Sequence, residues 1–234
     1  MRNDVRLYAA EFIGTAFIVF CAAGSVMITA ILGNLPGPLI SGAASGIIVT
    51  VMVWVLYDVS GAHFNPALTV SLAVFDGFPL RLVPGYIIAQ LMGSALAGAL
   101  LYVSLGPQAS MGANLPNTAL GISPSNAFVI ECVLSFLMML VIRGAFSASA
   151  PLRQFAAVPI GATVGMEVML LGPIAGAAMN PARAFGPYLF HGQWQYFWIY
   201  AGGPLVGILA AGLVWKLMRP VPPVVVVTSP QSVS

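Results

Sequence analysis

The tripeptide Asn-Pro-Ala occurs twice in a chain that is otherwise almost wholly apolar, and this repetition constrains the fold most strongly. The first copy is Asn65-Pro66-Ala67 and the second is Asn180-Pro181-Ala182. Each copy opens an apolar stretch of about ten residues, which as a helix rises roughly 15 Å, half of a hydrocarbon core of about 30 Å. The sequence therefore predicts two half-helices in corresponding positions of two halves, an arrangement typical of a polar pathway near the membrane midplane.

The composition places the chain among membrane proteins. Hydrophobic residues make up 59% of it and charged residues 6%, against about 25% charged residues in soluble domains. The net charge of +2, without a basic run, gives no reason to expect a nucleic-acid partner. Cys21 and Cys132 lie in apolar stretches, which favours small buried hydrophobes over a disulfide, and the Cys and His residues lack metal-ligand spacing. We therefore expect no metal site.

Long uncharged runs predict an all-α membrane protein with six transmembrane helices and two half-helices in an inverted repeat. The expected spans lie near residues 8–31, 39–57, 82–104, 126–143, 155–172 and 194–216. We expect the whole chain, 1–234, to be a single membrane channel domain with repeats at about 8–104 and 126–216. The tail 220–234, rich in Pro and Ser, is expected to be disordered. The N-terminal apolar run is too long for a signal peptide.

The basic residues predict the orientation. With six spans, all of them except Arg183 fall on one side of the membrane, namely Arg2, Arg6, Arg81, Arg143, Arg153, Lys216 and Arg219. That side should be the cytoplasm, so both termini should be cytoplasmic. The short loops favour a prokaryotic inner membrane. Because three spans and a half-helix are repeated upside down, the half-helices should meet with their N-termini at the centre.

The repeated motif has a definite chemistry at such a meeting point. Asn is a good N-cap and Pro is favoured at the first helical position. Two helix N-termini create a positive electrostatic maximum, and the amide groups of Asn65 and Asn180 can donate to a passing water or hydroxyl. Such a site favours neutral hydrogen-bonding molecules and opposes cations and protons.

Other polar residues fall within apolar segments. Arg183 follows the second motif, and at membrane depth it is a functional candidate that would repel cations and donate to solute oxygens. Glu11 and Glu131 occupy matching places in the two halves. They could form a proton relay, but we favour carboxylates that accept hydrogen bonds from the N–H groups of the adjacent loops. His63 is expected to line the pore or brace its loop. Glu167 has no assigned role.

Small residues recur at helical spacing in several spans. The pairs are Gly42 with Gly46, Gly93 with Ala97, Gly161 with Gly165, and Gly203 with Gly207. Such pairs let membrane helices approach closely. They are expected at contacts between spans.

The chain resembles the aquaporin family, the major intrinsic proteins, over about residues 8–216. Residues 60–69 and 176–187 look like the two signature loops of that family, and Glu11, Gln90 and Glu131 match its span residues. The resemblance implies a six-helix pore with two half-helices, one pore per subunit, and a homotetramer. It also implies passive flow, with no enzyme activity and no cofactor.

The resemblance further implies an outer constriction made of four residues, the selectivity filter Ser45, Val168, Ala177 and Arg183. Strict water channels typically carry Phe and His at the first two positions, so this filter should be wider and partly apolar. It is similar to those of plant nodulin-like channels and of bacterial aquaglyceroporin-type channels. The chain departs from common patterns at Asp58, where many relatives have His, and at Ala184, where glycerol facilitators have Asp.

Three functions are consistent with these features. The favoured one is a passive channel for small neutral solutes, such as glycerol-like polyols and hydroxylated metalloids including arsenous acid, with water as a further passenger. A water-selective pore is the first alternative. A proton-coupled transporter that uses Glu11, Glu131 or Glu167 is the second.

Overall fold

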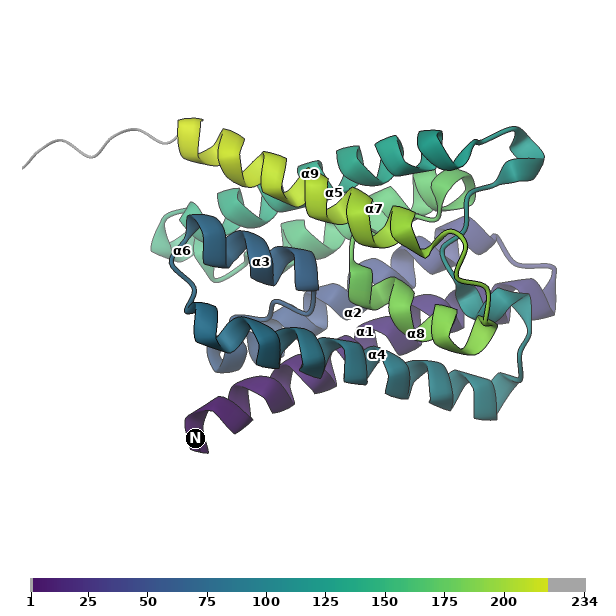
Figure 1. The fold of residues 1–234 in the computed structure, drawn as a ribbon, viewed down its shortest axis with the longest axis horizontal. Helices are drawn as coiled ribbons and strands as arrows, with labels where there is room; N and C mark the ends of the chain where they lie inside the picture. Colours follow the sequence, from purple (N-terminus) through teal and green to yellow (C-terminus); the bar gives the residue numbers. More distant parts are fainter. Residues whose placement is uncertain (1, 219–234) are drawn as a thin grey trace, which may run out of the picture.

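The computed structural model describes residues 2–218, and in this part of the chain long helices surround two short ones (Figure 1). Six helices are long and apolar enough to cross a membrane. They are α1 (Arg2–Leu32), α2 (Gly37–Ser60), α4 (Val83–Leu105, preceded by the 3₁₀ turn η1, Leu80–Leu82), α5 (Pro124–Ser147), α7 (Ala157–Ala175) and α9 (Phe197–Met218). The predicted fold class and all six predicted spans are confirmed. The tail expected to be disordered, 220–234, lies outside the described residues.

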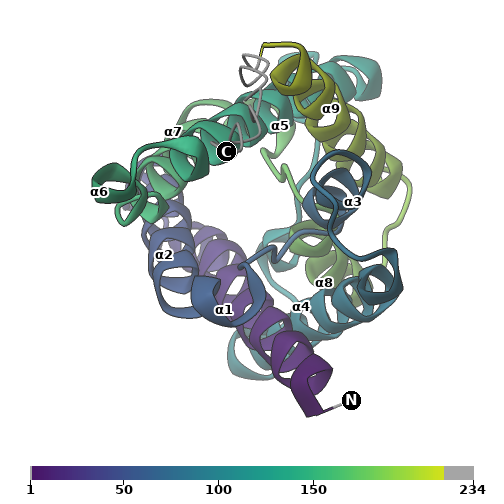
Figure 2. The same ribbon diagram turned by 90° about the vertical axis from the view of Figure 1, so that its left-hand side faces the viewer.

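The two half-helices follow the second and fifth spans, as the sequence predicts. They are α3 (Pro66–Phe75) and α8 (Pro181–His191). Both begin near the middle of the molecule and run in opposite directions (Figure 1). Viewed from its end, the molecule shows α3 between α9 and α4 (Figure 2). Each half-helix therefore packs against the long helices with its N-terminus toward the centre.

Close packing of the spans depends on glycine at the predicted positions. A Cβ atom at Gly46 would lie 2.6 Å from the carbonyl oxygen of Gly161, and one at Gly42 would lie 2.6 Å from that of Gly165. Any side chain at these two positions would thus collide with the backbone of the neighbouring helix. The contact between α2 and α7 brings together the spans that carry Ser45 and Val168.

The connections add short elements at both ends of the bundle. The long connection after α4 contains the 3₁₀ turns η2 (Ala109–Gly112) and η3 (Thr118–Leu120), and α6 (Ala150–Arg153) joins α5 to α7. The beginning of α1, the far end of α3, α6 and the end of α9 share one end of the molecule (Figure 1). We call this the inner end and the opposite one the outer end. An even number of membrane crossings follows from this placement.

Candidate solute pore

The two Asn residues cap the half-helices that they precede. The Oδ1 atom of Asn65 accepts hydrogen bonds from the backbone N–H groups of Ala67 and Leu68, at 3.0 and 3.4 Å. The Oδ1 atom of Asn180 accepts from the N–H of Ala182 at 2.9 Å. Both Asn residues are extended, with φ of −148° and −157°, and proline follows each at the first helical position. This is the local structure that the motif predicts.

The same side chains connect the two halves of the molecule. The Nδ2 atom of Asn65 donates to the carbonyl oxygen of Met179 at 2.9 Å, and that of Asn180 donates to the carbonyl oxygen of Phe64 at 2.8 Å. An amide NH₂ group has two N–H bonds. One N–H of each Asn is therefore bonded to the opposite loop, and both Asn residues also line the central cavity. Sequence reasoning did not foresee this reciprocal pair.

The loop before α3 is strained and is held by a buried carboxylate. Ala62 and Phe64 have φ of 52° and 50°, a left-handed conformation that costs roughly 1–2 kcal/mol for a residue with a side chain. Glu11, which is fully buried, accepts from the N–H groups of His63 and Phe64 at 2.9 and 2.7 Å. The hydroxyl of Ser60 and the amide of Gln90 also donate to it, both at 2.7 Å.

The loop before α8 repeats this construction. Ala177 and Met179 have φ of 48° and 54°. The buried carboxylate of Glu131 accepts from the N–H groups of Ala178 and Met179, both at 2.8 Å. Glu11 and Glu131 thus make the loop contacts expected of bracing residues. Neither is among the described residues that line the central cavity.

The orientation of these peptide groups determines what the loops present to the cavity. The N–H and C=O of a trans peptide group point in opposite directions, and the N–H groups of His63 and Phe64 point to Glu11. The carbonyl groups of the same peptides, which belong to Ala62 and His63, therefore point away from Glu11. Both residues line the cavity. The loops thus supply carbonyl acceptors beside the Asn donors.

One cavity of about 320 Å³ runs past both loops and reaches the predicted filter. All four filter residues line it, namely Ser45, Val168, Ala177 and Arg183, and so do Asn65 and Asn180. The structure therefore brings the predicted filter and the motif asparagines together around one space. The filter residues are thus two small side chains, one of them a hydroxyl, one apolar valine and one guanidinium group.

Arg183 is positioned by the connection between α4 and α5. Its Nη1 atom donates to the carbonyl oxygen of Gly112 at 3.0 Å. Gly112 ends the turn η2. Met111 in the same turn is buried in a cluster with Ala23 and Met27 of α1. This outer loop folds into the molecule, which its content of Gly and Asn alone does not predict.

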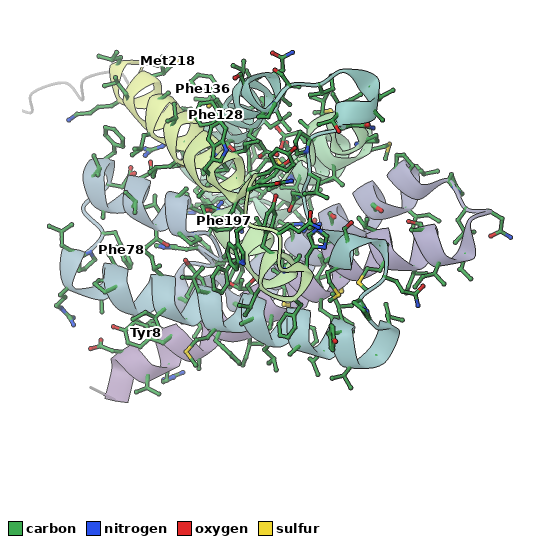
Figure 3. The ribbon with its side chains drawn as sticks, turned by 45° about the vertical axis from the view of Figure 1, so that its right-hand side comes forward. Tyr8, Phe78, Phe128, Phe136, Phe197 and Met218 are labelled. Atoms are coloured by element: carbon green, nitrogen blue, oxygen red, sulfur yellow. The ribbon has the colours of Figure 1, made fainter. Side chains whose placement is uncertain are left out.

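His63 lies beside the first motif and is held by aromatic side chains. Its Nδ1 atom is 3.1 Å from the hydroxyl of Thr69 in α3. Its ring packs against Phe78, which is labelled in Figure 3, and against Tyr86, with ring centroids 4.7 and 4.9 Å away. His63 also lines the cavity. It thus has features of both a bracing and a pore-lining residue.

Two further acidic residues lie away from the cavity. Glu167 on α7 is buried, and within residues 2–218 neither of its carboxyl oxygens has a hydrogen-bond partner. Asp58, near the end of α2, is exposed and borders a second hollow with Arg153, and Val53, Tyr57 and Phe146 line both this hollow and the central cavity. Neither is among the described residues that line the central cavity.

Comparisons with known proteins agree with this architecture. The model of the family "Major intrinsic protein" matches residues 2–215. A probable NIP-type aquaporin of Nicotiana alata is 42% identical over 213 residues, which cover 90% of this chain and 76% of the relative. Nodulin-26 of Glycine max is 37% identical, with the same two coverages. The aquaglyceroporin structure from Plasmodium falciparum superimposes with a TM-score of 0.79 at 24% identity, covering 92% of this chain and 96% of that one, which shows a shared fold.

The six spans, the two half-helices and the cavity lined by both motif asparagines define a multi-pass membrane channel. The chain belongs to the major intrinsic protein family, as the family model and the relatives show. It is accordingly a channel of the aquaporin type for water and small neutral solutes.

Proposed function

We propose that this channel conducts glycerol-like polyols and hydroxylated metalloids such as arsenous acid, together with water. The observation that carries the proposal is the filter, in which Ser45, Val168 and Ala177 line the cavity opposite Arg183. Three small or apolar side chains leave room for a carbon backbone, and the guanidinium donates to hydroxyl oxygens. The likeness to NIP-type and nodulin relatives supports the same assignment.

We further propose that the asparagines and Arg183 exclude ions while the carbonyl groups guide neutral solutes. Two half-helix N-termini place positive partial charge at the centre of the cavity. In this proposal the side chains of Glu11, Glu131 and His63 brace the loops. Their hydrogen bonds to the loop backbone and to Thr69 support that role.

The assembly and placement in the cell are also proposals. We propose one channel domain per chain, a homotetramer, and cytoplasmic termini. Among the described residues, Arg6, Arg81, Arg153 and Lys216 lie on elements near the inner end, which supports that orientation. The short loops favour a prokaryotic inner membrane, although the relatives named above are plant proteins.

The test compares water flux and solute flux in the same proteoliposomes by stopped-flow light scattering. We expect glycerol and arsenous acid to enter faster than in empty liposomes. Narrowing the filter with Ser45→Phe and Val168→His together should reduce glycerol entry by about tenfold or more, since steric exclusion of roughly 1.4 kcal/mol suffices for that factor. Water flux should be retained.

The alternatives predict different results. Fast water flow with glycerol entry at the level of empty liposomes would identify a water-selective pore. Solute flux that responds to a pH gradient or to membrane potential would identify a coupled transporter. Unchanged glycerol entry in the double variant would show that Ser45 and Val168 do not form the filter.

A further inference from the structure

A partly buried ion pair lies on the wall of the pore, at positions distant in sequence from the filter residues. The guanidinium of Arg143 on α5 donates to the carboxylate of Asp76 through two hydrogen bonds, Nη1 to Oδ1 at 2.9 Å and Nη2 to Oδ2 at 2.6 Å. Asp76 is the residue that ends α3. Both residues line the same cavity as the filter. The pair stands toward the inner end, where α3 ends.

The burial of the two partners is unequal. The side chain of Arg143 is 6% exposed and that of Asp76 is 29% exposed. The Arg143 guanidinium also lies over the ring of Phe75, 5.9 Å from its centroid. Its Nε atom is buried, and among the described residues it has no hydrogen-bond partner. The guanidinium of Arg143 thus holds the Asp76 carboxylate in place through two hydrogen bonds, and the Asp76 side chain remains partly exposed.

A purely structural clamp between α3 and α5 does not account for these features. A charged side chain within a membrane-spanning helix, as Arg143 is within α5, is a functional candidate by default. A clamp is most favourable when both partners are enclosed and every donor is paired. Here the carboxylate is partly open, and the Nε–H of the guanidinium is buried without a hydrogen-bond partner among the described residues. The bidentate contact instead holds the Asp76 carboxylate, an acceptor, beside the Arg143 guanidinium, a donor, in the wall of the pore.

We propose that Asp76 and Arg143 form a second solute-binding site at the inner mouth, in series with the filter, for adjacent hydroxyl groups of a polyol. One solute hydroxyl donates to the Asp76 carboxylate, and the neighbouring solute oxygen accepts from the Arg143 guanidinium. Because the pair has no net charge, it offers hydrogen bonds without attracting ions. This inference rests on the proposed conduction of polyols.

The site should act more strongly on polyols than on water. A polyol that enters a narrow pore loses several hydrogen bonds to water at once, and a fixed donor and acceptor replace two of them together. A single water molecule needs only one partner at a time, which the loop carbonyls already supply. The pair is therefore expected to raise the ratio of glycerol flux to water flux.

The experiment uses the double variant Asp76→Asn with Arg143→Gln, which removes both charges and keeps a polar side chain at each position. Glycerol and water flux are measured in the same proteoliposomes. We expect the glycerol-to-water ratio to fall by about tenfold, which corresponds to about 1.4 kcal/mol, the size of one hydrogen bond to a charged group.

A second ion pair provides a matched control. Arg81 and Asp4 are joined by a 3.2 Å contact, with Arg81 70% exposed, and neither is among the described residues that line the cavity. The variant Asp4→Asn with Arg81→Gln should leave the ratio unchanged. An equal fall in this control would mean that charge removal at the inner end in general changes the ratio, and would overturn the proposal.

Two outcomes distinguish this inference from the proposed function. Wild-type protein without glycerol flux would overturn both. Wild-type glycerol flux with an unchanged ratio in the pore-lining double variant would overturn the inner site alone. If that variant also loses water flux, the single variant Arg143→Lys is measured instead. Lysine keeps the positive charge but cannot make the bidentate contact with Asp76. We expect a lowered ratio for Arg143→Lys, and a wild-type ratio would overturn the proposal.

Discussion

The two loops that precede the half-helices are built on one plan but held in different ways. In the first loop, Glu11 accepts four hydrogen bonds, two of them from the side chains of Ser60 and Gln90. In the second loop, Glu131 accepts from two backbone N–H groups. The second loop is also held by Asn114, whose amide donates to the carbonyl oxygen of Gly176 at 2.7 Å.

Because of this difference, the first loop is anchored within the helix bundle, whereas the position of the second loop depends partly on the outer loop. The first loop is held by side chains of α1, α2 and α4 inside the bundle. The second loop, next to Arg183, is held partly by the outer loop that contains Gly112 and Asn114. Changes in the outer loop can therefore alter the filter without disturbing the centre of the pore. The halves share a backbone design and differ in the contacts that hold each loop.

The largest expected effect comes from the two carboxylates. Glu11→Gln and Glu131→Gln each keep the shape and replace one accepting oxygen by an NH₂ group. At Glu11 two donors lose their acceptor, which should lower the free energy of unfolding by about 2–4 kcal/mol. At Glu131 one N–H loses its acceptor, for about 1–2 kcal/mol. Thermal unfolding of both purified variants in the same detergent measures the difference.

Equal shifts in the two variants would contradict the comparison, as would a larger shift for Glu131→Gln. Water flux of the reconstituted variants serves as the control for folding. A stability difference without loss of water flux would show that the loops keep their conformation although fewer hydrogen bonds hold them. It would also support the bracing role over a proton relay.

A smaller effect is expected from two glycines in left-handed conformations. Gly112 has φ of 64° and Gly61 has φ of 83°, so Ala at either position costs about 1 kcal/mol in the backbone. A Cβ atom at Gly112 would also lie 2.8 Å from the Cα of Ala23, whereas one at Gly61 meets the His63 ring at 3.3 Å. The Gly112→Ala variant must therefore move the carbonyl group that holds Arg183.

We expect Gly112→Ala to lower the glycerol-to-water flux ratio by about threefold, because an Arg183 side chain that the Gly112 carbonyl no longer holds can extend into the filter. A threefold change in flux corresponds to less free energy than one typical hydrogen bond contributes. Gly61→Ala is the matched control, with lower stability and an unchanged ratio. Stopped-flow measurements on both variants decide the matter. A changed ratio in Gly61→Ala alone would mean that the filter depends on the first loop instead.

The sequence could predict the parts of this channel that are repeated or local. The half-helices, their Asn caps and the contacts of Glu11 and Glu131 with the loops follow from the duplicated motif and from matching positions in the halves. The reciprocal hydrogen bonds of Asn65 and Asn180 could not be foreseen, because the motif does not specify which loop atom each amide reaches.

The inner ion pair and the outer loop escaped prediction for a related reason. Arg143 was expected only as one of the basic residues on the inner side, and Asp76 had no assigned role. Their contact joins residues far apart in sequence and depends on how α3 packs beside α5. Likewise, Ser110 and Met111 have φ of 51° and 58°, values that no local sequence rule assigns to these residue types.

The smallest expected effect concerns two tyrosines that the halves share. The hydroxyl of Tyr86 donates to the carbonyl oxygen of Ser60 at 2.7 Å, and that of Tyr200 donates to Ala175 at 2.8 Å. Each contact holds the residue at which the loop begins. Tyr86→Phe and Tyr200→Phe should each lower the free energy of unfolding by about 1 kcal/mol, with equal midpoints in thermal unfolding. A clearly larger loss for Tyr200→Phe would mean that the second loop, with fewer side-chain contacts to its carboxylate, relies on this hydroxyl for the support that Gln90 and Ser60 give to the first.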